Sequence, residues 1–191
     1  GPMPSTRLSH LKTPPGMRWT LWFLMTCWCA SVYAATPTPG PTLAQAYRPG
    51  IDVTAYWVSE KYDGVRRIMD CTDTDAQPGS INRKGLRVGM PIETATALAP
   101  LGQHAPYQLD GELVGSVFYV FDVLQWGGRD CRGDDAETRS QRLNDVQAAV
   151  GTSTLVIPAP VARTVDEKRA LVAELQGRRA EGIVFKKQGG T

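Results

Sequence analysis

The feature that most constrains the fold is a lysine placed where an apolar run ends. Residues 55–58 (Ala-Tyr-Trp-Val) are rich in aromatic and β-branched side chains, which predicts a strand, and residues 61–64 (Lys-Tyr-Asp-Gly) follow closely. Asp-Gly is a strong turn signal, and the run from Val65 onward predicts a second strand. We therefore expect a hairpin over about residues 55–71, centred on Asp63-Gly64. Taken alone, the pattern also fits an ordinary surface lysine beside a turn.

The first part of the chain predicts export. Gly1-Pro2 before Met3 resembles an expression-tag scar, so residues 1–16 are interpreted as a tag or leader extension. Residues 17–34 combine a basic start, an apolar run and small residues at the end, which is typical of a signal peptide. The run is shorter than the ~20 residues of a membrane span. We expect no stable span after cleavage and a periplasmic or secreted location; the alternative is an N-terminal helix on a cytoplasmic protein.

Charge and composition limit what the rest of the chain can bind. The Pro-rich residues 35–42 predict an extended linker, and residues 43–191 the folded domain. Three of the 21 basic residues lie in residues 1–34, which leaves 18 basic and 19 acidic residues beyond them. Such a body is no general polyanion binder, so nucleic-acid contacts would come from local basic clusters. Two histidines are too few for a histidine metal site, and Cys71 and Cys131 could form a disulfide or stay free thiols.

Local signals predict the remaining elements in order. Strands are expected at residues 107–114 and 117–124, with Gly115-Ser116 as a two-residue turn between them. In the second of these strands, alternation places Phe118, Val120 and Asp122 on one face and Val117, Tyr119, Phe121 and Val123 on the other. Further predictions are a helix at 92–98, a helix at 136–150 capped by Asp135, a buried strand at 155–157, a helix opened by the capping box of residues 164–167, and a last strand at 180–186.

Five short motifs now follow one another along the chain. They are Lys-x-Asp-Gly-x-Arg at 61–66, Asn-Arg-Lys-Gly at 82–85, Asp-Gly-Glu-Leu at 110–113, Phe-Asp-Val-Leu at 121–124 and Glu-Gly-Ile-Val-Phe-Lys at 181–186. Each alone is explained by an ordinary turn or core strand, but the ordered set is hard to assign to chance. The order resembles the covalent nucleotidyltransferases: ATP-dependent DNA ligases, RNA ligases and mRNA capping enzymes. Residues 51–61 look most like the minimal, exported bacterial ATP-dependent DNA ligases.

The resemblance implies an α+β fold. It would be a nucleotidyltransferase (ATP-grasp-like) adenylation domain, in which antiparallel β-sheets are flanked by helices and the nucleotide binds between the sheets. The family normally continues into a Lys-x-Lys strand and an OB domain, and this sequence shows neither before Thr191. The domain is therefore expected to be C-terminally incomplete, with slow self-adenylation and weak nick binding.

The resemblance also implies the chemistry of the lysine. Lys61 would attack the α-phosphate of ATP and form a lysyl-AMP phosphoramidate. Only the neutral amine is a nucleophile, and a free lysine has a pKa near ~10.4. A divalent metal together with Arg66 and Lys186 would lower that pKa. Asp63 would raise it, which favours a structural role in the turn.

The same resemblance implies the partners of the lysine. Arg66 and Arg83 would hold the ribose and phosphates, Phe121 would stack on adenine, and Lys186 would neutralise charge developing on the phosphates. Glu112 would accept a hydrogen bond from ribose or hold the metal, which would be Mg²⁺ or Mn²⁺. The implied nucleotide-binding residues are Glu60, Arg66, Arg83, Glu112, Phe121 and Lys186, and the implied metal ligands are Glu112 and Glu181.

The expected function is an ATP-dependent DNA ligase domain that acts as a monomer on nicked duplex DNA, with RNA as a possible substrate. Two alternatives stay open. Only eight residues separate Glu112 from Phe121, a short spacing that is nearer to RNA ligases and RNA-end guanylyltransferases. The missing C-terminal strand and OB domain would also suit a non-catalytic remnant that binds a nucleotide or nucleic acid.

Overall fold

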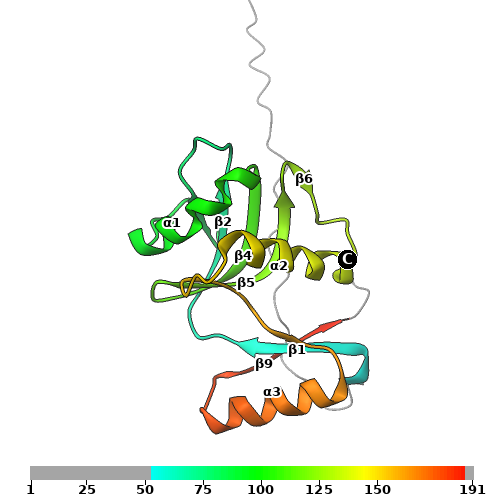
Figure 1. Ribbon diagram of the computed structural model, residues 1–191. Coiled ribbons are helices and arrows are strands. Elements are labelled where there is room, and N and C mark those ends of the chain that lie inside the picture. Colours follow the sequence, from blue (N-terminus) through cyan, green and yellow to red (C-terminus); the bar gives the residue numbers. More distant parts are fainter. Residues whose placement is uncertain (1–52, 188–191) are drawn as a thin grey trace, which may run out of the picture. The chain divides into compact units, whose positions relative to one another are not determined.

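The computed structural model describes residues 53–187, which belong to a single compact unit (Figure 1). The expected tag, signal peptide and linker, and the expected start of the domain at residue 43, lie outside the described residues. Two β-sheets and three α-helices follow one another in a mixed order. The prediction of an α+β fold is thus confirmed. Within the described part, no helix has the length and apolar character needed to cross a membrane.

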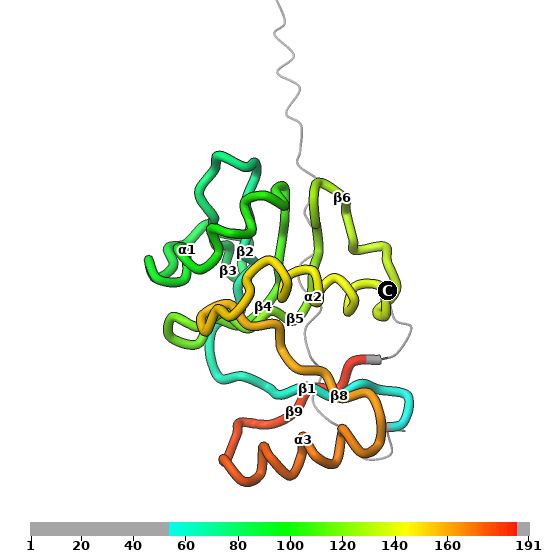
Figure 2. Tube along the Cα trace, viewed as in Figure 1, coloured from blue at the N-terminus to red at the C-terminus, as the bar shows by residue number. Residues whose placement is uncertain are grey.

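The smaller sheet is built around the strand that ends at the lysine. A short 3₁₀ turn, Val53–Ala55, leads into β1, Tyr56–Lys61. β1 lies between β8, Val161–Ala162, and β9, Gly182–Lys187, and both neighbours run antiparallel to it. Figure 2 shows these three strands together although they come from opposite ends of the described chain. The pairing of β1 with β9 runs from Tyr56 opposite Lys187 to Lys61 opposite Gly182.

The larger sheet contains the other strands. Its order is β3-β2-β4-β5-β6, and β7 pairs with β5 in parallel, the one parallel pairing in an otherwise antiparallel sheet of the described residues. The bounds are β2 Val65–Cys71, β3 Gly79–Asn82, β4 Tyr107–Val114, β5 Val117–Trp126, β6 Arg129–Asp130 and β7 Val156–Pro158.

The predicted hairpin at Asp63-Gly64 is wrong, because its two strands join different sheets. β1 pairs with β8 and β9, whereas β2 pairs with β3 and β4. Asp63-Gly64 therefore carries the chain from one sheet to the other. A Cβ on Gly64 would lie 2.3 Å from the backbone oxygen of Leu113, so β4 passes too close for any larger residue. The turn signal was real, but strand partners far along the chain decided the pairing.

The helices match their local signals closely and cover the sheets. α1 spans Ile92–Leu98 and leads into a 3₁₀ helix, Ala99–His104. α2, Ala136–Val150, packs on β5 and β7 of the larger sheet, and α3, Val165–Gly177, packs on β1 and β8 of the smaller one (Figure 1). The Asp135 carboxylate accepts from the Thr138 amide, and Thr164 and Glu167 form the predicted capping box.

The main core lies between the larger sheet and the helices that cover it. Its fully buried members include Met69, Tyr107, Leu109, Phe118 and Val123, contributed by β2, β4 and β5. Cys71 and Cys131 are both buried and both free thiols. Of the two alternatives from the sequence, the structure shows the two free thiols and not the disulfide. The opposite face of these strands carries Arg66, Asp110 and Glu112 among other residues.

A β-bulge in β5 overturns the predicted alternation of its side chains. Gly111 pairs with Val120 and Asp110 with Asp122, so Phe121 is an extra residue without a partner on β4. The bulge shifts the alternation by one position. Val123 consequently joins Phe118 and Val120 in the core, while Asp122 leaves that face and reaches the polar side. The predicted alternation placed Asp122 on the core face and Val123 on the opposite face. That prediction is wrong, because strict alternation makes no allowance for an inserted residue.

Candidate nucleotide site

Lys61 stands at the end of β1 with its amine held by a carboxylate. Its Nζ donates a hydrogen bond to Oε1 of Glu181, which immediately precedes β9. The Lys61 side chain is half exposed. The hydrogen bond to Glu181 raises the pKa of Lys61, and the charges of Glu181, Asp63 and Glu112 add to it. Arg66 and Lys186 were expected to lower this pKa, but the groups that dominate around the amine are carboxylates.

Glu60 is committed to a different partner. Successive strand residues point to opposite faces, and Glu60 is buried behind β1. Its two carboxylate oxygens accept hydrogen bonds from Nη1 and Nη2 of Arg178 at 2.9 and 2.6 Å. Arg178 follows directly after α3. The carboxylate of Glu60, expected among the nucleotide-binding groups, is therefore already occupied by a protein cation.

Arg66, Glu112 and Tyr119 form a lateral row on the polar face of the larger sheet. Arg66 on β2 lies opposite Glu112 on β4, and Glu112 lies opposite Tyr119 on β5. Cross-strand neighbours of this kind are close enough to interact. Burial raises the pKa of Glu112, while the charge of Arg66 and a hydrogen bond from the Gly64 amide oppose that rise. The register thus brings Arg66 and Glu112 together, as expected, and within electrostatic reach of Lys61.

An aromatic group lies beside this row. The bulged residue Phe121 has the guanidinium of Arg66 over its ring, 5.7 Å from the ring centroid. Tyr62 stacks on Tyr119 with ring centroids 3.8 Å apart and the planes 11° apart. Tyr62 and Phe121 are 6.0 Å apart and tilted by 18°. No motif in the sequence indicated a role for Tyr62 or Tyr119, although Tyr119 shared the predicted face of Phe121 and Tyr62 adjoins Lys61.

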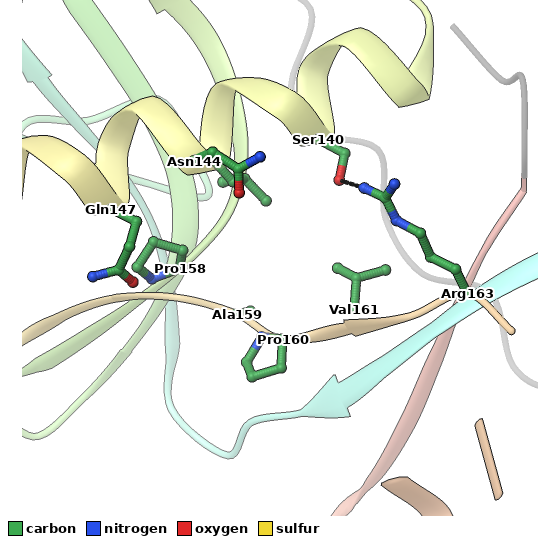
Figure 3. A pocket seen from close by; sticks show the side chains of 9 residues that line it. Ser140, Asn144, Gln147, Pro158, Ala159, Pro160, Val161 and Arg163 are labelled. Atoms are coloured by element: carbon green, nitrogen blue, oxygen red, sulfur yellow. Dashed lines mark hydrogen bonds between the residues drawn. The ribbon is translucent and has the colours of Figure 1, made fainter. Parts of the chain in front are cut away.

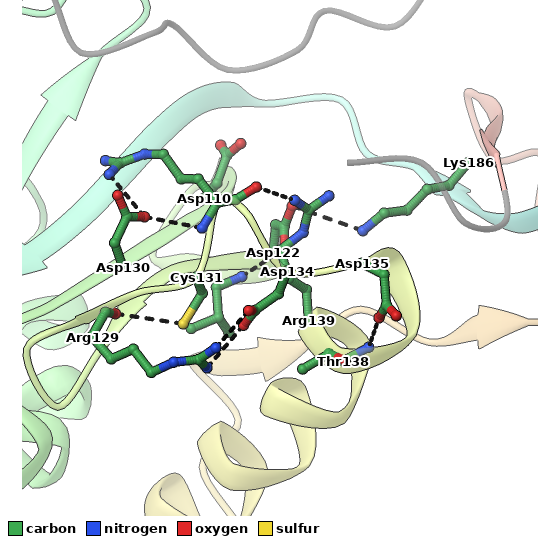
Figure 4. Close-up of polar contacts among 12 residues, drawn as sticks. Asp110, Asp122, Arg129, Asp130, Cys131, Asp134, Asp135, Thr138, Arg139 and Lys186 are labelled. Atoms are coloured by element: carbon green, nitrogen blue, oxygen red, sulfur yellow. Dashed lines mark hydrogen bonds and ion pairs between the residues drawn. The ribbon is translucent and has the colours of Figure 1, made fainter.

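Two aspartates on adjacent strands organise the cations of the site. Asp110 and Asp122 face each other across β4 and β5. Asp110 accepts from Nε and Nη2 of Arg66 at 2.5 and 2.6 Å. Asp122 lies 3.8 Å from Nζ of Lys186 and 3.2 Å from Nε of Arg139 on α2 (Figure 4). Both aspartates belong to the sequence motifs, but the motifs did not predict that their partners are Arg66, Arg139 and Lys186.

Arg139 and Lys186 approach Asp122 from different parts of the fold. Arg139 is buried, its Nη1 donates to the backbone oxygen of Arg132 at 3.0 Å, and its Nε pairs with Asp122 by charge without hydrogen-bond geometry. Burial lowers the pKa of Lys186, the charge of Asp122 opposes this, and Arg139 adds to the lowering. Lys186 comes from β9, so Asp122 links the two sheets by charge.

Arg83 stands apart from these residues. It lies on the exposed turn after β3, where Gly85 has a φ of 78° and Asn82 accepts from the amides of Lys84 and Leu86. Within residues 53–187 the Arg83 side chain forms no ion pair. Its expected contact with the nucleotide stays a prediction.

The two carboxylates expected to bind metal both act on the Lys61 amine. Glu181 touches it, and Glu112 raises its pKa by charge. In the part of the chain that the structure describes, no group of three or more His, Cys, Asp or Glu side chains is arranged to hold a metal. Mg²⁺ is commonly held by one or two carboxylates with water and substrate phosphates completing the shell. The donor chemistry of Glu112 and Glu181 fits that pattern.

Two hollows on the described surface lie away from these residues. A hollow of about 270 Å³ is lined by α2 and by the segment from Pro158 to Arg163, where Arg163 points toward Ser140 (Figure 3). A second of about 240 Å³ lies beside the end of α3 and the start of β9. Neither is lined by Lys61, Arg66, Glu112 or Phe121.

Comparison with known proteins gives a clear result for the fold. No family model and no curated protein matches the sequence. Among solved structures, a Lig E DNA ligase described as binding DNA with a minimal scaffold matches with a TM-score of 0.56 at 18% identity, over 80% of this chain and 63% of that chain. A mycobacterial DNA ligase D complexed with ATP and MES matches with a TM-score of 0.55 at 21% identity, over 71% and 49%. The ligase domain of M. tuberculosis LigD matches with a TM-score of 0.55 at 24% identity, over 71% of this chain and 48% of that chain.

These matches bear on the domain rather than on a whole enzyme. The chain spans between about half and two thirds of the length of these structures. At identities below a quarter, the likeness concerns the path of the backbone. The chain has the fold of ATP-dependent DNA ligase domains, as its five motifs predicted.

Proposed function

We propose that this chain is a covalent nucleotidyltransferase of the ATP-dependent DNA ligase type, with Lys61 as the nucleophile. One observation carries the proposal: ion pairs and cross-strand neighbours link the motif residues across two sheets. Glu181 accepts a hydrogen bond from Lys61, and the charge of Glu112 raises the pKa of Lys61. Glu112 lies opposite Arg66 on the neighbouring strand, and Arg66 forms an ion pair with Asp110. Asp110 faces Asp122, which pairs with Lys186. A surface ion pair has no need of so many matched partners.

The proposed reaction begins with the Lys61 amine. It must lose a proton before it can attack the α-phosphate of ATP; the new N–P bond then forms as the bond to pyrophosphate breaks. Glu181 and Glu112 stabilise the ammonium form. A divalent cation held by these two carboxylates would supply positive charge for the phosphates and weaken the carboxylates' hold on the ammonium. Lys61 would thus stay in its protonated, non-nucleophilic form until Glu181 and Glu112 bind the cation.

Arg66 and Lys186 would receive the negative charge of the phosphates. Asp110 uses Nε and Nη2 of Arg66, so Nη1 is not engaged by that carboxylate. Lys186 is largely withdrawn from solvent and held by Asp122. Cations fixed in advance near a reacting phosphate stabilise developing charge without reorganisation cost. Phe121 would offer to the base a ring face that is not covered by the guanidinium of Arg66, which lies over the ring.

ATP and nicked DNA are the proposed substrates. The ligase D structure of the same fold was obtained with ATP, and the Lig E ligase of the same fold is described as binding DNA. A ligase would transfer AMP from Lys61 to the 5′-phosphate of the nick and then release it as the 3′-hydroxyl attacks. We expect the protein to act as a monomer.

A second candidate acceptor is RNA. β4 and β5 are joined by the two-residue turn Gly115-Ser116, with Gly115 at a φ of 61°. This short connection leaves no inserted loop between Glu112 and Phe121, which is the feature that favours an RNA ligase or an RNA-end guanylyltransferase. The nucleotide and the acceptor distinguish these candidates.

The test is intact mass of the full chain after incubation with magnesium and ATP or GTP. We expect one added AMP from ATP, abolished in Lys61→Ala and retained in Lys168→Ala, which changes a lysine on α3. An adduct that survives Lys61→Ala would refute the nucleophile. A wild-type chain that binds ATP without forming an adduct, even with pyrophosphatase added, would favour the non-catalytic alternative. The adenylated chain is then offered nicked DNA and RNA ends in parallel.

A further inference from the structure

Tyr62 has no part in the chemistry proposed above, yet it is the aromatic residue nearest in sequence to Lys61. Its ring stacks on Tyr119 at 3.8 Å, almost parallel to it. Its centroid is 6.0 Å from that of Phe121, with a tilt of 18°. The Tyr62 ring is thus nearly parallel to both rings. It lies directly over Tyr119, whereas the 6.0 Å separation from Phe121 means that it is offset from that ring and borders the space over it.

We infer that Tyr62 is the lateral wall of the base-binding position and sets the nucleobase selectivity of this site. The inference rests on the proposed function, because it takes Phe121 as the platform for the base. Stacked rings lie in parallel planes, so a base on Phe121 would share a layer with the Tyr62 ring, edge against edge. Adenine and guanine have the same stacking face and differ only at their edges. A side chain such as Tyr62 that contacts the edge of the base can distinguish adenine from guanine, whereas a ring such as Phe121 that stacks on the face of the base cannot.

The wall is held from two sides, which selectivity requires. The stack on Tyr119 holds the face of the Tyr62 ring. The phenol interacts with Glu60, whose carboxylate is bound through both oxygens by Arg178. Glu60 is buried, whereas the Arg178 side chain is half exposed. The role expected of Glu60 in nucleotide binding would thus be exerted indirectly, through the position of Tyr62.

Tyr62 also adjoins the nucleophile in the backbone. Lys61 is the last residue of β1 paired with β9, opposite Gly182, and Tyr62 is the first residue beyond that pairing. A base in contact with the Tyr62 ring therefore touches the residue that directly follows Lys61 in the chain. A purine that displaces this ring would also displace the Lys61 backbone. Tyr62 is accordingly a positioning residue, which should affect both nucleotide affinity and the rate of adduct formation.

The test measures equilibrium binding of ATP and GTP to the full chain by calorimetry, in a Lys61→Ala background that prevents the covalent step. Tyr62→Leu removes the wall, and Tyr62→Phe keeps the ring but loses the phenol. Tyr56→Leu is the matched control, because Tyr56 is likewise a half-buried tyrosine but lies on β1 and contacts Phe185 instead. A lost aromatic contact corresponds to about 2- to 10-fold in affinity.

We expect Tyr62→Leu to weaken ATP binding by about 2- to 10-fold and to move the ATP-to-GTP preference toward one. Tyr62→Phe should retain most of the preference, and Tyr56→Leu all of it. If Tyr62→Leu does not fold by circular dichroism, Tyr62→Trp replaces it; the larger ring should narrow the position and weaken both purines. An unchanged ATP-to-GTP preference in a folded Tyr62→Leu chain, or unchanged affinity for both purines in a folded Tyr62→Trp chain, would overturn the inference alone. Absence of nucleotide binding by the parent chain would overturn the proposed function itself.

Discussion

Arg178 binds both carboxylate oxygens of Glu60, and three residues later Glu181 binds Lys61, the neighbour of Glu60 in the chain. One short connection, between α3 and β9, therefore holds two consecutive β1 residues of opposite charge on opposite faces of the strand. Between the two contacts, Arg179 adopts a φ of 51°, which is uncommon for a residue other than glycine. The paired charges define where the connection lies and thereby place Glu181 against the lysine.

Removing Arg178 should destabilise the domain more than removing an ordinary surface arginine. Arg178→Ala leaves the buried Glu60 without its partner, so we expect a lower free energy of unfolding than in a variant that loses an exposed ion pair. Arg169→Ala is the control, because Arg169 and Asp166 form an exposed pair at 3.8 Å. Urea unfolding of both variants is the measurement. Equal unfolding midpoints would show that Glu60 does not depend on Arg178.

The protonation of Lys61 should depend on Glu181. The carboxylate raises the pKa of Lys61, so Glu181→Gln should lower it and leave more neutral amine at any given pH. We expect faster labelling of Lys61 by an amine-specific reagent in Glu181→Gln, with the pH profile moved to lower pH. Peptide mass spectrometry follows the labelling, and Lys168 serves as the internal reference. A profile unchanged by the substitution would contradict the role of Glu181.

The same ion pair has a defined effect on stability. Because the folded-state pKa of Lys61 is raised, its contribution is fully present below the unfolded pKa of about 10.4. It is lost as the pH rises through the higher folded value. We expect the difference in unfolding midpoint between wild type and Lys61→Met to be constant near neutrality and to shrink in strongly alkaline solution. A difference that grew with alkaline pH would be incompatible with the pair.

Asp122 should matter for stability as well as for Lys186. Asp122→Asn leaves the buried Arg139 without its counter-charge, and we expect a loss of about 1–3 kcal/mol. Asp145→Asn is the matched control, because Asp145 pairs with Arg142 on the same helix at 3.1 Å in a more exposed position. The charge of Asp122 also raises the pKa of Lys186, so that pKa should fall further in the variant. Chemical denaturation and lysine labelling measure the two effects separately.

Gly111 should tolerate no side chain. A Cβ there would lie 2.1 Å from the backbone oxygen of Tyr119 and 2.7 Å from the Phe118 ring. We expect Gly111→Ala to cost about 1–3 kcal/mol or more, since backbone of the neighbouring strand would have to move. Gly133→Ala is the control, because no atom lies within 4 Å of the added methyl group. Equal stability of the two variants would mean that β4 and β5 are less closely apposed than the structure shows.

Sequence reasoning succeeded where the determining contacts are local. α1 and α2 were predicted with their observed bounds, and Thr164 with Glu167 as the observed capping box. In each case the hydrogen bonds join residues three or four positions apart, and the cap is readable in the same few residues. The turn at Gly115-Ser116 is equally local, because glycine supplies the positive φ that it needs.

The candidate site was predicted only in part for the same reason. The ordered motifs correctly indicated the fold and brought Lys61, Arg66, Glu112 and Glu181 into one neighbourhood. They gave no sign that Tyr62 stacks on Tyr119, or that Arg139 and Arg178 hold Asp122 and Glu60. These partners lie on helices and strands far apart in the chain.

The sequence by itself determined the helices, the turns and the order of the motifs, because short-range hydrogen bonds and residue chemistry decide them. Only the tertiary structure decided that β1 and β2 part into different sheets and that the bulge turns Asp122 toward Lys186. It also decided that Lys61 faces carboxylates rather than cations. Strand pairing and register depend on contacts among segments separated by as many as a hundred residues or more, so no local pattern can specify them.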